Sequence, residues 1–74
     1  MPKHKAGFAV CLRNNGFPAS LEVRKLYPFI ADREAEADDL IRIVDESGED
    51  YLYAAHFFRK LVYRRTTDAV MAYD

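Results

Sequence analysis

Residues 40–58, LIRIVDESGEDYLYAAHFF, spell a β-hairpin together with its turn. An apolar run rich in β-branched residues (40–44) meets a polar cluster (45–50), and the aromatic run Tyr-Leu-Tyr follows at once. Asp suits the first position of a type I turn, and Gly suits the left-handed residue through which the returning strand pairs with a bulge. We therefore predict a hairpin whose turn starts at Asp45 and in which Gly48 has a positive φ.

Short alternating segments on both sides of the hairpin predict further strands at residues 8–13, 25–31 and 59–63. Residues 21–24 fit either a short strand or a returning loop arm. Pro28 favours an edge position or a bulge because it cannot donate to a ladder. Residues 54–57 fit a single 3₁₀ turn. The whole pattern predicts an all-β fold, a small five-stranded antiparallel barrel.

Alternation within these strands also predicts which side chains fill the core. The expected core consists of Phe8, Val10, Leu12, Leu26, Ile30, Ile41, Ile43, Leu52 and Leu61. If Leu52 points inward, Tyr51 and Tyr53 share the opposite face, and both rings would be at least partly exposed. With 74 residues the domain is near the lower size limit for folding without a disulfide or a metal, so this core must be well packed.

The expected domain covers residues 8–63, after a flexible N-terminus of residues 1–7. The tail, residues 64–74, contains Thr66 and Asp68 in positions that permit a short C-terminal helix. No run approaches the ~20 apolar residues of a membrane span, and the start does not fit a secretory signal. The single cysteine, Cys11, cannot form an internal disulfide. These features predict a cytoplasmic protein that has no membrane partner.

Charge is distributed unevenly along the chain, although the net charge is only −1. Residues 32–50 hold nine of the twelve acidic residues against two arginines, a net charge of −7. Residues 32–39 lack an apolar stripe, so we expect an acidic loop with at most one helical turn there. If this loop and the hairpin turn lie at one end of the molecule, the protein is an electric dipole.

The order of these pieces resembles that of the Src-homology-3-like barrel: strand, long loop, strand, loop, tight hairpin, 3₁₀ turn and final strand. The chain also resembles a group of short bacterial proteins of uncharacterised function. They share the hairpin IRIVDESGEDYLY, residues 41–53 here, and a preceding Ser-Leu-Glu element, residues 20–22 here. The resemblance covers residues 8–63 and implies a small barrel without an assigned activity. This chain has Ala54 where that group carries a proline, and it has no tryptophan, which peptide-binding domains of this fold carry at their groove.

The residues that could support catalysis or metal binding have no suitable context. His56 has no orienting acid and nucleophile in a recognisable motif. The acidic turn at 45–50 lacks the alternating oxygen ligands of a calcium loop, and no Cys/His spacing fits zinc. We therefore expect no enzyme, no catalytic residue, no metal and no cofactor.

An aromatic set with neighbouring acids suggests a binding surface instead; its members are Phe17, Tyr27, Tyr51, Tyr53 and Phe57. Large rings with a polar tip give contact area at low entropic cost, and nearby charge selects the partner. The expected anchors are Tyr27, Tyr51, Tyr53 and Phe57, with Asp38 and Asp39 selecting a basic partner. This set predicts a non-catalytic interaction module for a protein partner or for a second copy. The alternative interpretation is that the rings only cover the core, as tyrosines commonly do in small barrels.

A second function class is a small barrel that binds nucleic acid. It would use basic side chains with neighbouring aromatic rings. The candidates are Arg13, Arg24, Lys25, Arg59, Lys60, Arg64 and Arg65. The sequence pI of about 6.1 makes this the less favoured alternative, because nucleic-acid-binding domains are typically basic.

Overall fold

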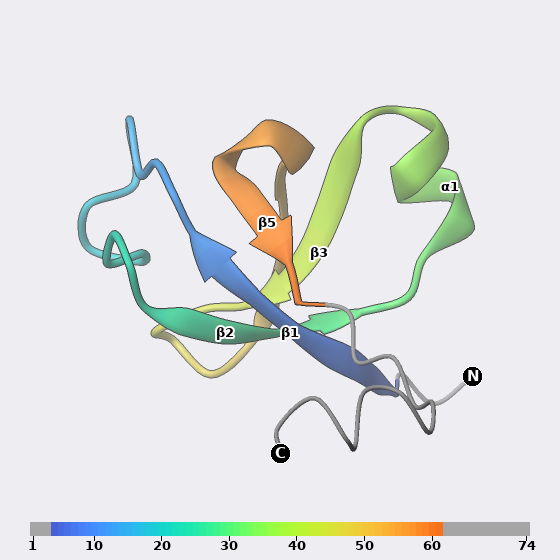
Figure 1. Ribbon diagram of the computed structural model, residues 1–74, viewed down its shortest axis with the longest axis horizontal. Coiled ribbons are helices and arrows are strands. Elements are labelled where there is room, and N and C mark those ends of the chain that lie inside the picture. Colours follow the sequence, from blue (N-terminus) through green and yellow to red (C-terminus); the bar gives the residue numbers. More distant parts are fainter. Residues whose placement is uncertain (1–3, 62–74) are drawn as a thin grey trace, which may run out of the picture.

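The computed structural model describes residues 4–61, which form one five-stranded antiparallel sheet with a very short helix and one 3₁₀ turn (Figure 1). The elements are β1 (Lys5–Cys11), β2 (Leu26–Ile30), α1 (Arg33–Ala37), β3 (Leu40–Val44), β4 (Asp50–Ala54), η1 (Ala55–Phe57) and β5 (Phe58–Lys60). In space the strands lie in the order β4-β3-β2-β1-β5, so the last strand lies beside the first. The predicted all-β class is confirmed.

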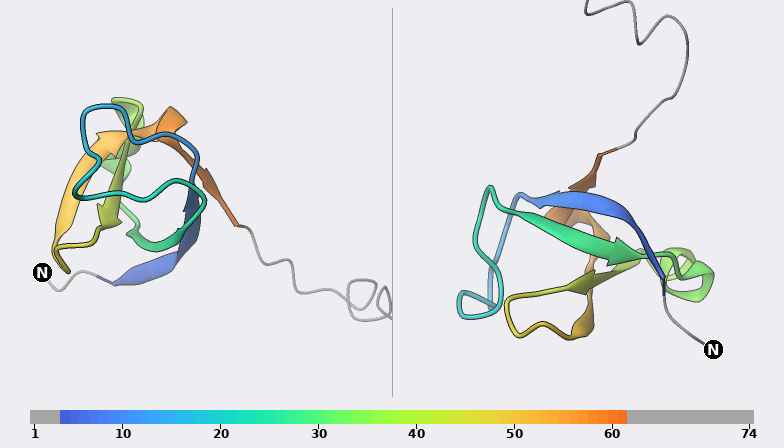
Figure 2. Two further views of the ribbon diagram at one scale, coloured as in Figure 1. Left: turned by 90° about the vertical axis from the view of Figure 1, so that its left-hand side faces the viewer. Right: turned by 90° about the horizontal axis from the view of Figure 1, so that it is seen from below.

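The sheet curls strongly around its inner face (Figure 2). Within residues 4–61, β4 and β5 are the two edges and do not pair with each other. The hydrogen-bonded sheet is therefore open, and the predicted closed barrel is not confirmed by the strand pairing. The expected C-terminal helix and the tail at 64–74 lie outside the described residues.

The hairpin between β3 and β4 has the predicted turn. Gly48 has a φ of 86°, and its N–H donates to the carbonyl of Asp45 over 2.9 Å. The N–H of Asp45 donates in turn to the carbonyl of Glu49 over 3.2 Å, which is the bulge that a left-handed glycine allows. The Asp45 carboxylate also accepts from the N–H of Ser47 over 2.9 Å. Local contacts within five residues thus fix this turn.

The strand β1 begins at Lys5, three residues earlier than expected, and β2 is the central strand. Of the two positions predicted for Pro28, the edge strand is therefore wrong, and the irregularity in the β1–β2 ladder lies between Lys5 and Gly7, just beyond Phe8, the partner of Pro28. β2 pairs with β1 along its whole length, but its pairing with β3 starts only at Phe29. Pro28 lies just before that stretch, so its missing N–H falls where the ladder to β3 has ended.

The core differs from the predicted one in β1, β2 and β4. Ile41 and Ile43 are buried as expected. Phe8, Leu12, Leu26 and Leu61, by contrast, are about half exposed, and Val10, Ile30 and Leu52 are only partly buried. The observed core cluster consists of Ala9, Cys11, Leu21, Tyr27, Phe29, Ile41, Ile43, Tyr53 and Phe58.

The reason for this difference is the volume available inside the curled sheet. Both faces of β1 are apolar, so alternation alone does not decide which face turns inward. The small side chains of Ala9 and Cys11 face the interior because the rings of Tyr27, Phe29 and Phe58 already fill it. The larger side chains of β1, including Phe8, are left on the outer face.

A long loop, residues 12–25, joins β1 to β2, and residues 21–24 form a loop arm rather than a strand. The β1–β2 ladder continues into its base, where Arg24 N–H donates to the Cys11 carbonyl over 2.7 Å. Leu21 is 1% exposed and fills one end of the core. The loop is therefore packed onto the sheet by its own apolar side chain.

The helix α1 is five residues long, slightly more than the single turn expected. Asp32 caps it by accepting a 3.1 Å hydrogen bond from the N–H of Ala35. Because α1 precedes β3 and the hairpin turn follows β3, the two acidic segments lie at opposite ends of that strand (Figure 1). Arg42 in β3 forms ion pairs of 2.8 Å with both Asp32 and Asp50. The electric dipole predicted for two acidic loops at one end of the molecule is therefore not formed in that way, because the loops lie at opposite ends of β3.

Candidate functional site

Four aromatic rings gather beside β4, and Phe17 from the long loop lies at their centre. Its ring centroid is 4.9 Å from that of Tyr53, 6.0 Å from that of Tyr51 and 6.4 Å from that of Phe57. Tilted and edge-to-face arrangements at these distances are the favourable ones for aromatic pairs. The structure thus brings together three of the predicted anchors around Phe17, a further ring of the aromatic set predicted from the sequence.

The two tyrosines of β4 share one face as predicted, but they differ in exposure. Tyr53 pairs with Ile41 and is 2% exposed, whereas Tyr51 pairs with Ile43 and is 52% exposed. The expectation that Tyr53 is exposed is wrong because its face is the inner face of the sheet. Tyr51 lies nearer the hairpin turn. We call Phe17, Tyr51 and Phe57 the aromatic surface, because the first and last of these rings are partly exposed as well.

The hydroxyl of the buried Tyr53 is tied to the hairpin turn. It donates a 2.6 Å hydrogen bond to the carboxylate of Asp45. Burial and this neighbouring carboxylate raise the pKa of Tyr53 well above its ordinary value. For Asp45, burial alone would raise the pKa, but the hydrogen bonds from Ser47 and Tyr53 outweigh burial and lower it. Tyr53, which supports the aromatic surface, is therefore fixed by ring packing on Phe17 and by the hydrogen bond of its hydroxyl to Asp45.

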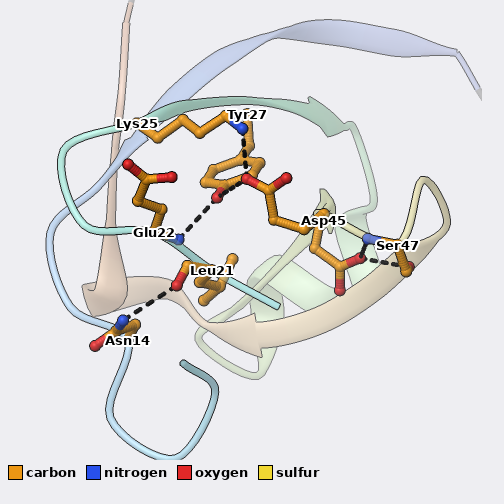
Figure 3. A network of polar contacts seen from close by, with 8 residues as sticks. Asn14, Leu21, Glu22, Lys25, Tyr27, Asp45 and Ser47 are labelled. Carbon is orange, nitrogen blue, oxygen red and sulfur yellow. Dashed lines mark hydrogen bonds and ion pairs between the residues drawn. The ribbon is translucent and has the colours of Figure 1, made fainter. Parts of the chain in front are cut away.

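Tyr27 is 3% exposed and belongs to a separate polar network rather than to the aromatic surface (Figure 3). Its hydroxyl donates to the Glu46 carboxylate over 2.6 Å and accepts from the N–H of Glu22 over 2.8 Å. Lys25 forms a 2.5 Å ion pair with the same carboxylate. Burial together with the bond to Glu46 raises the pKa of Tyr27 to about 12. Tyr27 is thus a structural residue, and the prediction that it anchors a partner is not supported by its position.

Glu46 is the residue that sequence reasoning missed, because its partners are 19 to 26 residues away. Besides holding Tyr27 and Lys25, it donates its backbone N–H to the carbonyl of Ser20 over 3.0 Å. The hydrogen bonds from Lys25 and Tyr27 lower the pKa of the Glu46 carboxyl. The hairpin turn therefore fastens the long loop, and with it Phe17, to the sheet. No local pattern in the sequence signals this contact.

Asp38 and Asp39 are exposed and end α1, away from Tyr51. Asp39 has a φ of 61°, and its carbonyl accepts a 2.9 Å hydrogen bond from the N–H of Ala55 in η1. Asp38 and Asp39 therefore lie beside η1, at the end of the aromatic surface that contains Phe57. They do not surround the exposed ring of Tyr51.

The two other residues considered for chemistry, His56 and Cys11, pack against or within the core. His56 packs edge-to-face on Phe57 with centroids 5.1 Å apart. Cys11 is fully buried, and burial raises the pKa of its thiol. Within residues 4–61 no three His, Cys, Asp or Glu side chains are grouped so as to hold a metal ion.

The basic residues of the nucleic-acid alternative do not form one free surface. Lys25 pairs with Glu46, and Lys60 lies 3.4 Å from Glu36. Arg59 is on β5, while Arg13 and Arg24 belong to the long loop. Arg64 and Arg65 lie outside the described residues.

Comparison with known proteins finds no protein-family model, no curated protein and no solved structure that matches this chain. None of the helices in the described part of the chain has the length and apolar character needed to cross a bilayer.

Proposed function

We propose that this protein is a non-catalytic interaction module that binds a protein partner through the aromatic surface. The observation that carries this proposal is the half-exposed ring of Tyr51, which stacks on a supported cluster instead of projecting alone into solvent. Rigid, partly exposed aromatic rings are the side chains that most often dominate binding energy at protein interfaces. Their order is already fixed in the free protein, which lowers the entropic cost of binding.

The charges near the aromatic surface favour a basic partner. Glu49 is exposed two residues before Tyr51, and Asp38 and Asp39 lie beside η1 at the other end. Acidic groups at the rim of an interface steer a basic partner and raise its association rate. A reducing cytoplasm suits this proposal, since the single cysteine is a buried thiol.

We also propose that the curled sheet is a barrel of the Src-homology-3-like type. The element order supports this: β1, a long loop, β2, a short acidic connection, the β3–β4 hairpin, a 3₁₀ turn and β5. The position of β5 beside β1 supports it as well. In such a barrel, Phe17 of the long loop and Phe57 of the 3₁₀ turn would lie on one side of the domain.

The experiment that tests the proposed function compares capture from a bacterial lysate, with and without nuclease, by the immobilised full chain and by two variants. Tyr51→Ser removes the exposed ring, and Val23→Ser changes an exposed apolar residue of the long loop as a matched control. We expect one partner to be captured by the wild type and by Val23→Ser, and to be lost with Tyr51→Ser. With the purified partner, Tyr51→Ser should weaken binding by about 30-fold, or about 2 kcal/mol.

Two results would overturn this proposal. The first is equal capture by the Tyr51 variant and the wild type. The second is a bound species that disappears with nuclease and whose affinity falls steeply as salt rises, which would favour the nucleic-acid alternative. Replacing Asp38 and Asp39 together by Asn should lower the association rate at low salt and leave dissociation nearly unchanged.

A further inference from the structure

A second apolar surface lies on the outer side of the sheet, where β1, β2 and β5 meet. Phe8, Leu26 and Leu61 are 51%, 49% and 51% exposed. The N–H of Leu61, the residue after β5, donates to the carbonyl of Phe8 over 2.9 Å, and Val10 pairs with Leu26, so these side chains lie on neighbouring segments of the sheet. Large apolar side chains gathered in this way on a small domain mark an interaction site more often than scattered ones do.

These residues line a groove of about 610 Å³, which we call the outer groove; its walls include Ala6, Phe8, Leu26, Phe29, Lys60 and Leu61. Gly7 gives the groove access to the ring of Phe29, because a Cβ at this position would lie 3.2 Å from that ring. Three wall residues of the groove, Phe8, Leu26 and Leu61, are ones that sequence alternation placed in the core. The groove is separate from the aromatic surface, with which it shares no residue.

The charged residues of the three strands that form the groove are all basic. β1, β2 and β5 contain Lys5, Arg59 and Lys60 and no acidic residue. Lys60 pairs with Ala9 and lines the groove from the side of Phe29. Arg59 pairs with Val10 and, by strand alternation, lies beside the groove on the outer face with Leu61. Among residues 4–61 it has no ion-pair partner. Lys60 lies 4.8 Å above the ring of Phe29, and its 3.4 Å contact with Glu36 is exposed and therefore weak.

We propose that the outer groove binds an acidic amphipathic segment of a partner protein. Apolar side chains of that segment would lie on Phe8, Leu26 and Leu61, and its carboxylates would face Arg59 and Lys60. Apolar burial would supply affinity, and complementary charge would supply orientation and selection. The protein would then hold two partners of opposite charge on two separate surfaces.

Charge and composition favour this occupant over the others. A second copy joined through the same face around a two-fold axis would bring the basic residues of each copy against those of the other. Single-stranded nucleic acid binds by stacking successive bases on aromatic rings, whereas among residues 4–61 Phe8 is the only exposed ring at the groove, and Leu26 and Leu61 are aliphatic.

The test uses the full chain and three fluorescein-labelled synthetic peptides of twelve residues. In the first peptide Leu alternates with Glu, in the second Lys replaces every Glu, and in the third Ser replaces every Leu. By fluorescence anisotropy, we expect the first peptide to bind at least tenfold more tightly than the other two. Leu26→Ser should weaken it at least tenfold, and Arg59→Glu should shift the preference toward the lysine peptide. Both residues are exposed, so far-UV circular dichroism should show the fold retained.

A matched control separates this proposal from the proposed function: Tyr51→Ser should leave the affinity of the acidic peptide within twofold. The proposal is overturned if the acidic peptide binds no more tightly than the lysine peptide, or if neither groove variant changes its affinity. Tighter binding of phosphatidylglycerol vesicles or of a twelve-residue oligothymidylate, lost with the same variants, would also overturn it. Those results would assign the groove to a membrane surface or to nucleic acid.

Discussion

The hydroxyl of Tyr53 donates a 2.6 Å hydrogen bond to the carboxylate of Asp45, so the buried ring of β4 holds the first residue of the hairpin turn. The same turn holds the long loop through Glu46, and Phe17 of that loop packs on Tyr53. The aromatic surface, the hairpin turn and the long loop therefore stabilise one another through direct contacts. Four predictions test this arrangement and the fold beneath it.

Replacing Tyr53 by Phe should lower the free energy of unfolding by about 1.5–3 kcal/mol, the range for a hydrogen bond to a charged group. The ring stays in place, so the loss reports the hydrogen bonds of the hydroxyl, which are the one to Asp45 and one with Ser20. Urea unfolding measures it. Tyr51→Phe is the matched control, because its ring is half exposed, and it should change stability by less than about 0.5 kcal/mol. Equal effects of the two variants would contradict the structural role assigned to Tyr53.

Stability should fall as the pH drops below about 4, near the ordinary pKa of Asp. The hydrogen bonds of Asp45 lower its pKa in the folded state, so its contribution is present above the unfolded pKa and is lost as the pH falls through the folded pKa. The pKa of Asp32, lowered by the Ala35 N–H and by Arg42, acts in the same direction. Urea midpoints between pH 7 and pH 2 measure the effect. Asp45→Asn should flatten this dependence, and an unchanged profile would show that other groups cause it.

Gly48→Ala should cost about 1 kcal/mol, since a φ of 86° is unfavourable for a residue with a Cβ. Apart from its two chain neighbours, no atom of residues 4–61 lies within 4 Å of the added methyl group, so the cost comes from the backbone conformation. Gly48→Asn is the informative comparison, because Asn tolerates the left-handed region better, and it should cost less than Ala. Thermal unfolding of the pair provides the measurement. The reverse order would contradict the proposed origin of the cost.

Ile43→Ala should cost about 2–5 kcal/mol, because Ile43 is fully buried at the centre of the sheet. A domain of this size has about 4–11 kcal/mol in total, so much of the protein should unfold. Leu26→Ala removes an equally large side chain from the outer face and should cost less than about 1 kcal/mol. Denaturant unfolding of both variants therefore tests the strand register. A loss of about 2 kcal/mol or more for Leu26→Ala would show that Leu26 is buried, as alternation predicted, and would contradict the observed register.

The sequence by itself determined the elements that depend on near neighbours. The turn from Asp45 to Gly48 needs only contacts within five residues, so the hairpin and its positive φ could be predicted. The five strands, the 3₁₀ turn and the aromatic set beside β4 could also be predicted, because apolar alternation and turn residues mark them locally. Strand alternation also predicted the partial exposure of Tyr51, whereas the burial of Tyr53 was not predicted.

Only the tertiary structure decided which apolar residues are inside. Both faces of β1 carry apolar side chains, and the choice of Ala9 over Phe8 for the interior depends on rings contributed by β2 and β5. Tyr51 and Tyr53 have the same residue type and share a face, yet one is exposed and the other buried. The bond between Tyr27 and Glu46 joins residues 19 positions apart. Interior volume and long-range contacts are properties of the assembled sheet, so local alternation carries no information about them.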